Sequence, residues 1–179
     1  MAIGASIFKV NLTLSNLNDH FYHDFSLTMA KHPSENEGRM MNRLALFCLC
    51  AHPELAFTKG LSTQDEPEIW LKDHSGRINH WIEMGQPDDK RIRQAVGKAD
   101  KVSVFSTHDS TTDSWYAKIK DKVPLDRVNL FQLKTIENGP LEKLVKKSMD
   151  LSCLIEEDNL YLGDDTQRVG LNCLRLGKS

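Results

Sequence analysis

The segment EPEIWLKDHSGRINHWIEMG, residues 66–85, constrains the fold of this chain more than any other stretch. Apolar and polar residues alternate on both sides of a polar DHSGR sequence, which is typical of two antiparallel strands joined by a tight turn. The pattern predicts strands over about 67–73 and 78–84, with Ser75 and Gly76 at the tip of a two-residue turn. The fold must therefore accommodate a hairpin at this place.

Two aromatic residues specify the register of this hairpin. A two-residue turn puts Trp70 directly opposite Trp81 and Ile69 opposite Ile82. Cross-strand aromatic pairs are favourable, and a slip by one residue would send the side chains of a strand to the wrong face. We therefore expect the two tryptophans to share one face of the hairpin and the two isoleucines to share the other.

The same register brings two acidic residues together. It places Glu68 opposite Glu83 on the face of the tryptophans, where like charges destabilise each other. Three arrangements relieve the repulsion: one carboxyl group stays protonated, an arginine or lysine lies between the two, or a divalent cation binds both. Alternatively, the glutamates lie at an exposed strand end and water separates them. Asp65 and Glu66 come just before this pair, and either could take the place of Glu68.

The rest of the chain predicts a mixed protein of helices and strands. Ser34 and Glu37 form an S-x-x-E capping box before apolar residues at helical spacing, which predicts a helix over about 34–51. Pro87, followed by two aspartates, predicts the start of a second helix. Alternating or apolar runs predict further strands over 6–17, 21–32, 101–107 and 127–134, and a C-terminal hairpin or three short strands. We see no repeat, linker or boundary, so we expect one domain over 1–179.

Composition excludes some classes of partner. The formal net charge is −2 at pH 7, so no global positive field points to a nucleic acid or a membrane surface. No apolar run approaches the ~18 residues of a membrane span, and the N-terminus resembles a strand rather than a signal peptide. The four cysteines form no C-x-x-C pair, which favours free thiols in a reducing compartment. We expect a cytoplasmic protein; the sequence identifies no protein partner.

Four motifs, HPSENEGRMMNRL, FTKGL, DEPEIWL and WIEMGQPDDKRIRQA, resemble the YaeQ family of bacterial proteins, and the similarity covers nearly the whole chain. That family is similar in turn to the PD-(D/E)XK nucleases, in which helices flank a mixed central sheet. The resemblance implies an α/β (mixed α+β) fold. It implies a restriction-endonuclease-like core over about 34–135, with extra hairpins at the N- and C-termini.

The resemblance also implies a metal site. Glu68, after Pro67, matches the acid of the P-D dipeptide, and Glu83 matches the acid of E-x-K. Glu35 matches an acid that often lies on the preceding helix, although it could instead form an ion pair with Arg39. The implied cofactor is Mg²⁺ or Mn²⁺, bound by these three glutamates.

The resemblance fails at the lysine of E-x-K, because Gly85 stands there. Lys90 is the preferred replacement cation and Arg91 the second choice, and Gln86 is a candidate orienting group. For substrate binding, the candidates are Arg91, Arg93 and Lys98, although charged helical faces are usually just solvated.

Two classes of function follow from this reading. The first is a divalent-metal-dependent nuclease that binds nucleic acid weakly and in a salt-dependent manner, because acids outnumber bases. The alternative is a catalytically inactive nuclease-fold module for binding or regulation, which the missing lysine favours. A third interpretation, a zinc site of His20, His23 and His32, is disfavoured because successive strand residues point to opposite faces.

Overall fold

The structure is a computed structural model, and it describes residues 4–59 and 64–177. The chain divides into two compact units. The first contains the chain up to Pro53 together with Thr135–Asn172, and the second contains Glu54–Lys134 and the chain from Cys173 onward. Gly60 and Leu61 of the FTKGL motif lie outside the described residues. Within those residues, no helix is both long enough and apolar enough to cross a membrane.

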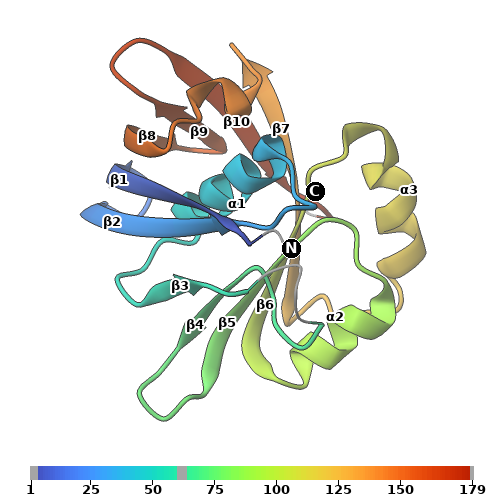
Figure 1. The fold of residues 1–179 in the computed structure, drawn as a ribbon. Coiled ribbons are helices and arrows are strands. Elements are labelled where there is room, and N and C mark those ends of the chain that lie inside the picture. The colour runs from blue at the N-terminus through green and yellow to red at the C-terminus, as the bar shows by residue number, and fades with distance from the viewer. Residues whose placement is uncertain (1–3, 60–63, 178–179) are drawn as a thin grey trace. The chain divides into compact units, whose positions relative to one another are not determined.

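The first unit is a mixed sheet built from both ends of the chain (Figure 1). Its strands follow the order β2-β1-β8-β9-β10, in which β1 and β8 are parallel and the other neighbouring pairs are antiparallel. The elements are β1 (Ser6–Asn16), β2 (Phe21–Lys31), α1 (Glu37–Leu49), the 3₁₀ turn η2 (Leu141–Leu144), β8 (Ser148–Glu156), β9 (Asn159–Gly163) and β10 (Arg168–Arg175).

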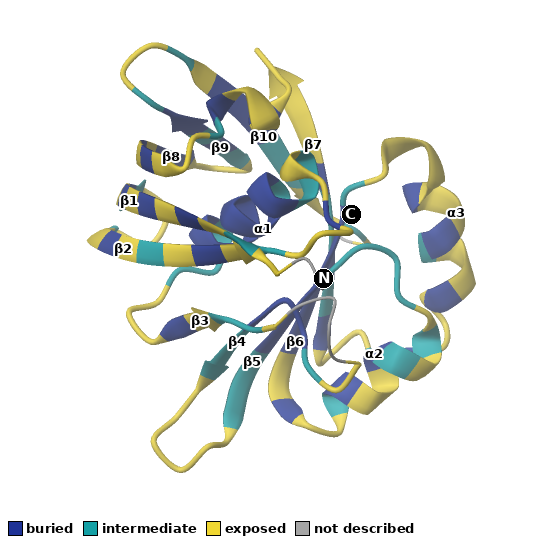
Figure 2. Ribbon diagram, in the orientation of Figure 1, coloured by how far each residue is buried: buried dark blue, intermediate teal, exposed yellow. Residues whose placement is uncertain are grey.

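Strict alternation along β1 builds the core of this unit. Every second residue from Phe8 to Leu14 is buried, and the residues between them are exposed. Helix α1 is buried along most of its length, including Met40, Met41 and Leu44, each with 0% of its surface exposed. The blue segments of β1 and α1 in Figure 2 mark this core. The predicted N-terminal hairpin and the three C-terminal strands are confirmed.

Helix α1 begins later than the predicted capping box. Its N-cap is Asn36, whose side-chain oxygen accepts a hydrogen bond from the backbone N–H of Arg39 at 2.8 Å. Ser34 instead bonds the ring of His32, with Oγ and Nδ1 2.6 Å apart. The capping-box prediction is therefore wrong, because a competing local bond engages the serine hydroxyl.

The second unit is a mixed sheet with two helices. Its strands follow the order β7-β6-β5-β4-β3. The parallel strands β5, β6 and β7 are linked through α2 and α3, and the antiparallel hairpin β4–β5 extends the sheet toward β3. The elements are β3 (Leu55–Phe57), β4 (Ile69–Lys72), β5 (Ile78–Met84), α2 (Asp89–Val96), β6 (Ala99–Ser106), α3 (Asp109–Ile119) and β7 (Val128–Glu137), the last of which continues into the first unit. Both units confirm the mixed α+β class.

The hairpin has the expected register and an unexpected turn. Trp70 pairs with Trp81 and Ile69 with Ile82, as predicted. The turn, however, closes between Asp73 and Arg77, where the Asp73 N–H donates to the Arg77 carbonyl at 3.0 Å. The loop thus has three residues and ends on Gly76 at φ +88°, so the predicted two-residue turn is wrong. An irregularity between Leu71 and Lys72 restores the register.

Both helices cover one face of this sheet. Trp81 of β5 packs into a buried cluster with apolar residues of both helices and of the neighbouring strands, which include Ile92, Ala95, Val102, Val104, Trp115, Ile119, Val128 and Leu130. In Figure 2 the buried side of α3 faces the sheet and its other side is exposed. Strand β5 is therefore a buried, rigid support for residues near its C-terminal end.

His80 of β5 predicts a pH-dependent loss of stability. Burial, followed by the charge of Lys101, lowers its pKa to about 4, and its Nε2 lies 2.8 Å from Ser103 Oγ. The unfolded chain therefore binds a proton at higher pH than the folded chain. The free energy of unfolding is therefore highest above pH ~6.5. It decreases by about 2–3 kcal/mol as the pH falls from there to 4.

Urea unfolding at pH 7 and pH 4 checks this prediction. His80→Gln should remove about 2–3 kcal/mol of the pH dependence, whereas His74→Gln, which removes an exposed histidine in the hairpin loop, should leave it unchanged. An equal pH dependence in the wild type and His80→Gln would refute the assignment.

Candidate functional site

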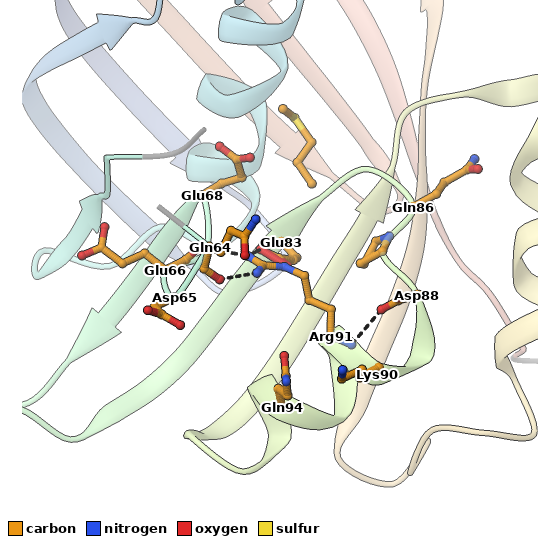
Figure 3. Close-up of a pocket in the computed structure, with 12 residues that line it drawn as sticks. Gln64, Asp65, Glu66, Glu68, Glu83, Gln86, Asp88, Lys90, Arg91 and Gln94 are labelled. Carbon is orange, nitrogen blue, oxygen red and sulfur yellow. Dashed lines mark hydrogen bonds and ion pairs between the residues drawn. The ribbon is translucent and has the colours of Figure 1, made fainter. Parts of the chain in front are cut away.

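A polar cleft of about 710 Å³ lies in the second unit. It is lined by the C-terminal end of β5, the first half of α2 and the segment before β4 (Figure 3). The lining residues are Gln64, Asp65, Glu66, Glu68, Glu83, Met84, Gln86, Pro87, Asp88, Lys90, Arg91 and Gln94. The cleft thus contains both hairpin glutamates and most of the predicted site residues around them.

Glu68 is buried, and its backbone is held by both neighbouring segments. Its N–H donates to the carbonyl of Ile82 at 3.1 Å, and its carbonyl accepts from the N–H of Thr58 at 3.1 Å. The hydroxyl of Thr58 also bonds the carbonyl of Pro67. Only 7% of Glu68 is exposed, whereas the side chain of Asp65 is 95% exposed. Glu68 is therefore the fixed carboxylate of this segment.

Glu83 of β5 binds the guanidinium of Arg91. Arg91 Nε donates to Glu83 Oε2 at 2.5 Å, and Nη2 donates to Oε1 at 2.9 Å. The same guanidinium donates to two backbone carbonyls of the segment before β4, from Nη1 to Gln64 and from Nη2 to Glu66, the latter at 3.0 Å. The structure therefore shows one of the three predicted ways to relieve the repulsion between the glutamates: an arginine, Arg91, binds one of them, Glu83.

The pKa of Glu83 is raised, primarily by burial. The hydrogen bonds and positive charge of Arg91 oppose this increase, and the negative charge of Glu68 adds to it. The negative charge of Glu68 therefore acts on Glu83 in the same direction as burial. Both residues line one cleft, and their place on one face of the hairpin stays a prediction.

The cleft is acidic as a whole. Its lining carries five carboxylates, from Asp65, Glu66, Glu68, Glu83 and Asp88, against two cations, Lys90 and Arg91. Lys90 is exposed on the first turn of α2 and makes no ion pair or hydrogen bond within the described ranges. Such a surface attracts cations more readily than polyanions.

The remaining predicted binding residues have local partners. Arg93 pairs with Asp89, one turn earlier on α2, at 2.9 Å. Lys98 lies 3.8 Å from Asp65 and 5.7 Å from the centre of the Trp81 ring. Neither residue lines the cleft.

Gln86 points away from the Glu83–Arg91 pair (Figure 3). Its side-chain nitrogen donates to Ser106 Oγ and Thr111 Oγ1, each at 2.9 Å, and so links the end of β5 to β6 and α3. Gly85, just before it, has φ +107°, in the region that favours glycine. A Cβ at Gly85 would meet nothing within 4 Å, so the backbone conformation alone selects glycine there.

Glu35 belongs to the first unit, just before α1. Its Oε1 accepts from Arg43 Nε at 2.8 Å and from Arg39 Nη1 at 3.0 Å, and its Oε2 accepts from Arg43 Nη2 at 2.8 Å. The predicted ion pair with Arg39 is thus present, together with a buried bidentate pair that the sequence analysis missed. Its role as a third metal ligand stays a prediction.

The donors in the cleft suit a hard cation. Mg²⁺ is commonly bound by one or two carboxylates, with water and substrate oxygens completing its coordination. Glu68 and Glu83 supply two carboxylates, but both oxygens of Glu83 already bind Arg91. Within 4–59 and 64–177, no group of three or more His, Cys, Asp or Glu side chains is placed to hold a metal. A divalent cation therefore fits this pair only with water, and only where Arg91 gives way.

Comparison with known proteins identifies the family. A model of the family described as "YaeQ protein" matches residues 1–173, nearly the whole chain. The chain belongs to the YaeQ family. The "Uncharacterized protein YaeQ" of Escherichia coli (strain K12) is 34% identical over 174 residues, which cover 96% of each chain. The protein of the same name from Salmonella typhi is 34% identical over 166 residues, covering 92% of this chain and 91% of the relative.

Two solved structures share the fold of this YaeQ-family chain. The YaeQ protein from Xanthomonas axonopodis pv. citri superposes with a TM-score of 0.88 at 28% identity, covering 98% of this chain and 99% of that one. The YaeQ protein from Pseudomonas syringae superposes with a TM-score of 0.85 at 28% identity, covering 98% and 97%. The names of these relatives specify no activity, so the function of the cleft has to be argued from its geometry.

Two supporting residues of the YaeQ-family cleft escaped the sequence analysis. Thr58 holds the backbone of Glu68, but Thr58 follows β3, Glu68 precedes β4, and no local pattern links two residues ten positions apart. Asp88 is the N-cap of α2 and accepts from the N–H of Arg91 at 2.9 Å. The sequence carried that signal, because aspartate is a favoured N-cap, but the aspartate was assigned only to the first turn.

Proposed function

We propose that the YaeQ-family cleft hydrolyses phosphodiester bonds with the help of a divalent cation, Mg²⁺ or Mn²⁺. The observation that carries the proposal is the pair of buried carboxylates that line one open cleft, Glu68 just before β4 and Glu83 in the neighbouring strand β5. The resemblance to PD-(D/E)XK nucleases supports it, because those enzymes place their acids on neighbouring strands. The chain order of α1, β3, β4, β5, α2 and β6 agrees with that restriction-endonuclease-like core.

The residues have distinct roles in this proposal. Glu68 and Glu83 hold the cation, which supplies a Lewis acid and an acidified water when bound. Gly85 stands where those nucleases carry lysine, and its positive φ disfavours a lysine there. Lys90 is then the exposed cation of the cleft that can approach a substrate phosphate and stabilise developing charge. Since the cleft is acidic, nucleic acid should bind weakly and lose affinity steeply with salt.

A nuclease assay tests the proposal. Supercoiled, linear and single-stranded DNA, and RNA, are incubated with the protein in Mg²⁺ or Mn²⁺ and with EDTA. We expect metal-dependent cleavage that falls about tenfold or more in Glu68→Gln and in Glu83→Gln. Asp65→Asn is the matched control, because it removes the same charge from an exposed position of the same cleft. Absence of cleavage, or cleavage unchanged by Glu83→Gln, would refute the catalytic role.

A second candidate function is a non-catalytic binding or regulatory module. The observation that favours it is the set of four hydrogen bonds by which Arg91 joins Glu83 to the segment before β4. In that case Arg91 is the permanent counter-ion of Glu83, and the carboxylates serve the fold. Isothermal titration with Mn²⁺ separates the candidates when it is run beside the nuclease assay, because a module in which Arg91 stays on Glu83 should show neither Mn²⁺ binding nor cleavage.

A further inference from the structure

We infer that the first unit contains a second binding site, which takes a monosaccharide that carries a phosphate or carboxylate group. The site is a hollow of about 310 Å³ on the solvent-facing side of the sheet formed by β1, β8, β9 and β10. It shares no residue with the cleft of the second unit. The inference therefore goes beyond the proposed function and stands whether or not the cleft is a nuclease site.

Strand register brings a guanidinium and two hydroxyl groups into one row across the sheet. Thr13 of β1 lies opposite Ser152 of β8, and Ser152 lies opposite Gly163 of β9. Gly163 in turn lies opposite Arg168 of β10. Thr13, Ser152 and Arg168 are exposed and alternate with core residues along their strands, so their side chains share the solvent-facing side. All members of this row line the hollow.

A glycine keeps the middle of this row open. A Cβ at Gly163 would lie 2.5 Å from the carbonyl oxygen of Gln167, so a larger residue fits there only if the backbone shifts. The missing side chain leaves a gap in the row between Ser152 and Arg168. The hollow is therefore a consequence of the way in which β9 turns into β10.

The guanidinium of Arg168 is held in place without an acidic partner. Its Cζ lies 4.5 Å from the centre of the Tyr161 ring, and this ring lies against Gly170, where a Cβ would be 3.2 Å from Tyr161 Cε1. Arg168 makes no ion pair with any residue in the ranges 4–59 and 64–177. A guanidinium stacked on a ring keeps its planar fork of N–H groups available for a carboxylate or a phosphate. We therefore place the anionic group of the ligand at Arg168.

The nearby acids do not bind this guanidinium. Asp164 lines the hollow, but its Oδ1 accepts hydrogen bonds from the backbone N–H groups of Thr166 and Gln167, each at 2.9 Å. Asp24 of β2 ends the same row, and it lies four strand spacings, ~19 Å, from Arg168, which exceeds the Debye length. The positive charge of Arg168 is therefore left for a ligand.

The hydroxyl groups of the hollow also lack protein partners. Elsewhere on the same face, side chains bond one another across the strands at 2.9 Å, in the pairs Lys9–Thr28 and Asn11–Asp150. Thr13, Ser15 and Ser152 line the hollow, and their side chains make no hydrogen bond with any described residue. A hydroxyl both donates and accepts, so three of them suit the hydroxyl groups of a sugar ring. The unbonded part of the face coincides with the hollow, which points to a ligand that completes these bonds.

The size and the apolar lining of the hollow fit a single ring. Ligand pockets have volumes from about 300 Å³ upward, so a hollow of about 310 Å³ holds one sugar unit rather than a chain. Leu154 and Tyr161 are half-buried and supply apolar surface for the C–H face of the ring. A sugar phosphate and a sugar acid share the required chemistry, a hydroxylated ring with one anionic group.

The test is a titration of the full chain with four probes, followed by calorimetry and by saturation-transfer NMR. The probes are glucose 6-phosphate, glucuronate, glucose and inorganic phosphate. We expect glucose 6-phosphate, glucuronate or both to bind. Glucose and inorganic phosphate should bind about tenfold or more weakly, because each lacks one of the two kinds of contact. The tighter of the two anionic sugars identifies the anionic group as phosphate or carboxylate.

Substitutions of two cations on the same face test the role of the guanidinium. Arg168→Met should weaken binding of the anionic sugar about tenfold or more, and Arg168→Lys should weaken it less, because the charge remains but the planar fork is lost. Lys9→Met is the matched control. It removes the same charge from the same face outside the hollow and should change the affinity by less than about threefold.

A measurement on the wild type covers the case in which an Arg168 variant does not fold. The anionic sugar is titrated into ¹⁵N-labelled protein, and the backbone amide signals of Ser152, Gly163 and Arg168 should shift. The amide signal of Gly85, beside the cleft of the second unit, should not shift.

Four results would overturn the inference. These are the absence of binding with a Kd below about 10 mM for either anionic sugar, equal affinity for inorganic phosphate or for glucose, equal losses in Arg168→Met and Lys9→Met, and amide shifts that map to the cleft instead of the hollow. Each of them leaves the proposed nuclease site untouched, because the nuclease assay concerns residues of the second unit. Conversely, a failed nuclease assay leaves this site standing.

Discussion

Replacing Arg43 with methionine is expected to lower the free energy of unfolding by about 3–5 kcal/mol. Arg43 lies in α1 with 4% of its side chain exposed, and it binds both oxygens of Glu35, whose side chain is 2% exposed. It also donates from Nη2 to the carbonyl of Ala30 in β2, at 2.8 Å. The substitution leaves a buried carboxylate without its bidentate partner and removes a link between α1 and β2. Urea unfolding followed by circular dichroism measures the loss.

Two further variants show whether the buried charge is the cause. Arg39→Gln removes a half-buried arginine from the same Glu35 oxygen and should cost about 1 kcal/mol or less. Combining Glu35→Gln with Arg43→Met removes both charges and should regain part of the lost stability. Equal losses in Arg39→Gln and Arg43→Met would contradict the assignment. If the double variant folds and binds Mn²⁺ like the wild type, Glu35 is a structural residue and not a metal ligand.

The register of the hairpin could be predicted because two facing tryptophans specify it. The turn could not, since Asp73 closes a longer loop by accepting from the N–H groups of Ser75 and Arg77 at 2.8 and 3.0 Å. The irregularity after Leu71 compensates for the extra residue. A wrong turn and a correct register are therefore compatible, because burial of one face decides the register more strongly than the loop does.

The choice between Lys90 and Arg91 depended on where α2 begins. Successive residues of a helix point about 100° apart, so a shift of one residue in the N-cap redirects both side chains. With Asp88 as N-cap, Arg91 reaches the carboxylate of Glu83 and Lys90 remains on the exposed side. The sequence indicated that an arginine or a lysine could relieve the glutamate repulsion. It did not specify the first residue of α2, and the choice between Lys90 and Arg91 depends on that residue.

The two-unit organisation was beyond the sequence analysis. The first unit depends on the parallel pairing of β1 with β8, in which Leu12 lies beside Leu151. Both strands show the expected alternation, but alternation says which face is buried and not which strand lies alongside. Only pairing within hairpins carries a local signal, in the turn between the strands. The sequence could therefore relate Glu68 to Glu83 through one hairpin. It could not predict that Glu35 belongs to a different unit.

Replacing Trp81 with alanine is expected to cost about 3–5 kcal/mol of unfolding free energy. Trp81 is 2% exposed and lies in the cluster that joins β5 to both covering helices. Loss of its side chain leaves a large cavity under α2, the helix that carries Arg91. The cavity would lie only two residues along β5 from Glu83. We therefore expect the variant to weaken the support of the cleft as well as the core.

Trp70→Ala is the matched control for this prediction. Trp70 lies directly opposite Trp81 in β4, but it is only partly buried, and Lys72 Nζ lies 3.6 Å from the centre of its ring. Its removal deletes the same side chain from the same cross-strand pair without opening the cluster, and it should cost about 1–2 kcal/mol. Urea unfolding of both variants, followed by far-ultraviolet circular dichroism, measures the difference. Similar losses would mean that the cross-strand pair, and not the helix-covered cluster, stabilises β5 and the cleft at its end.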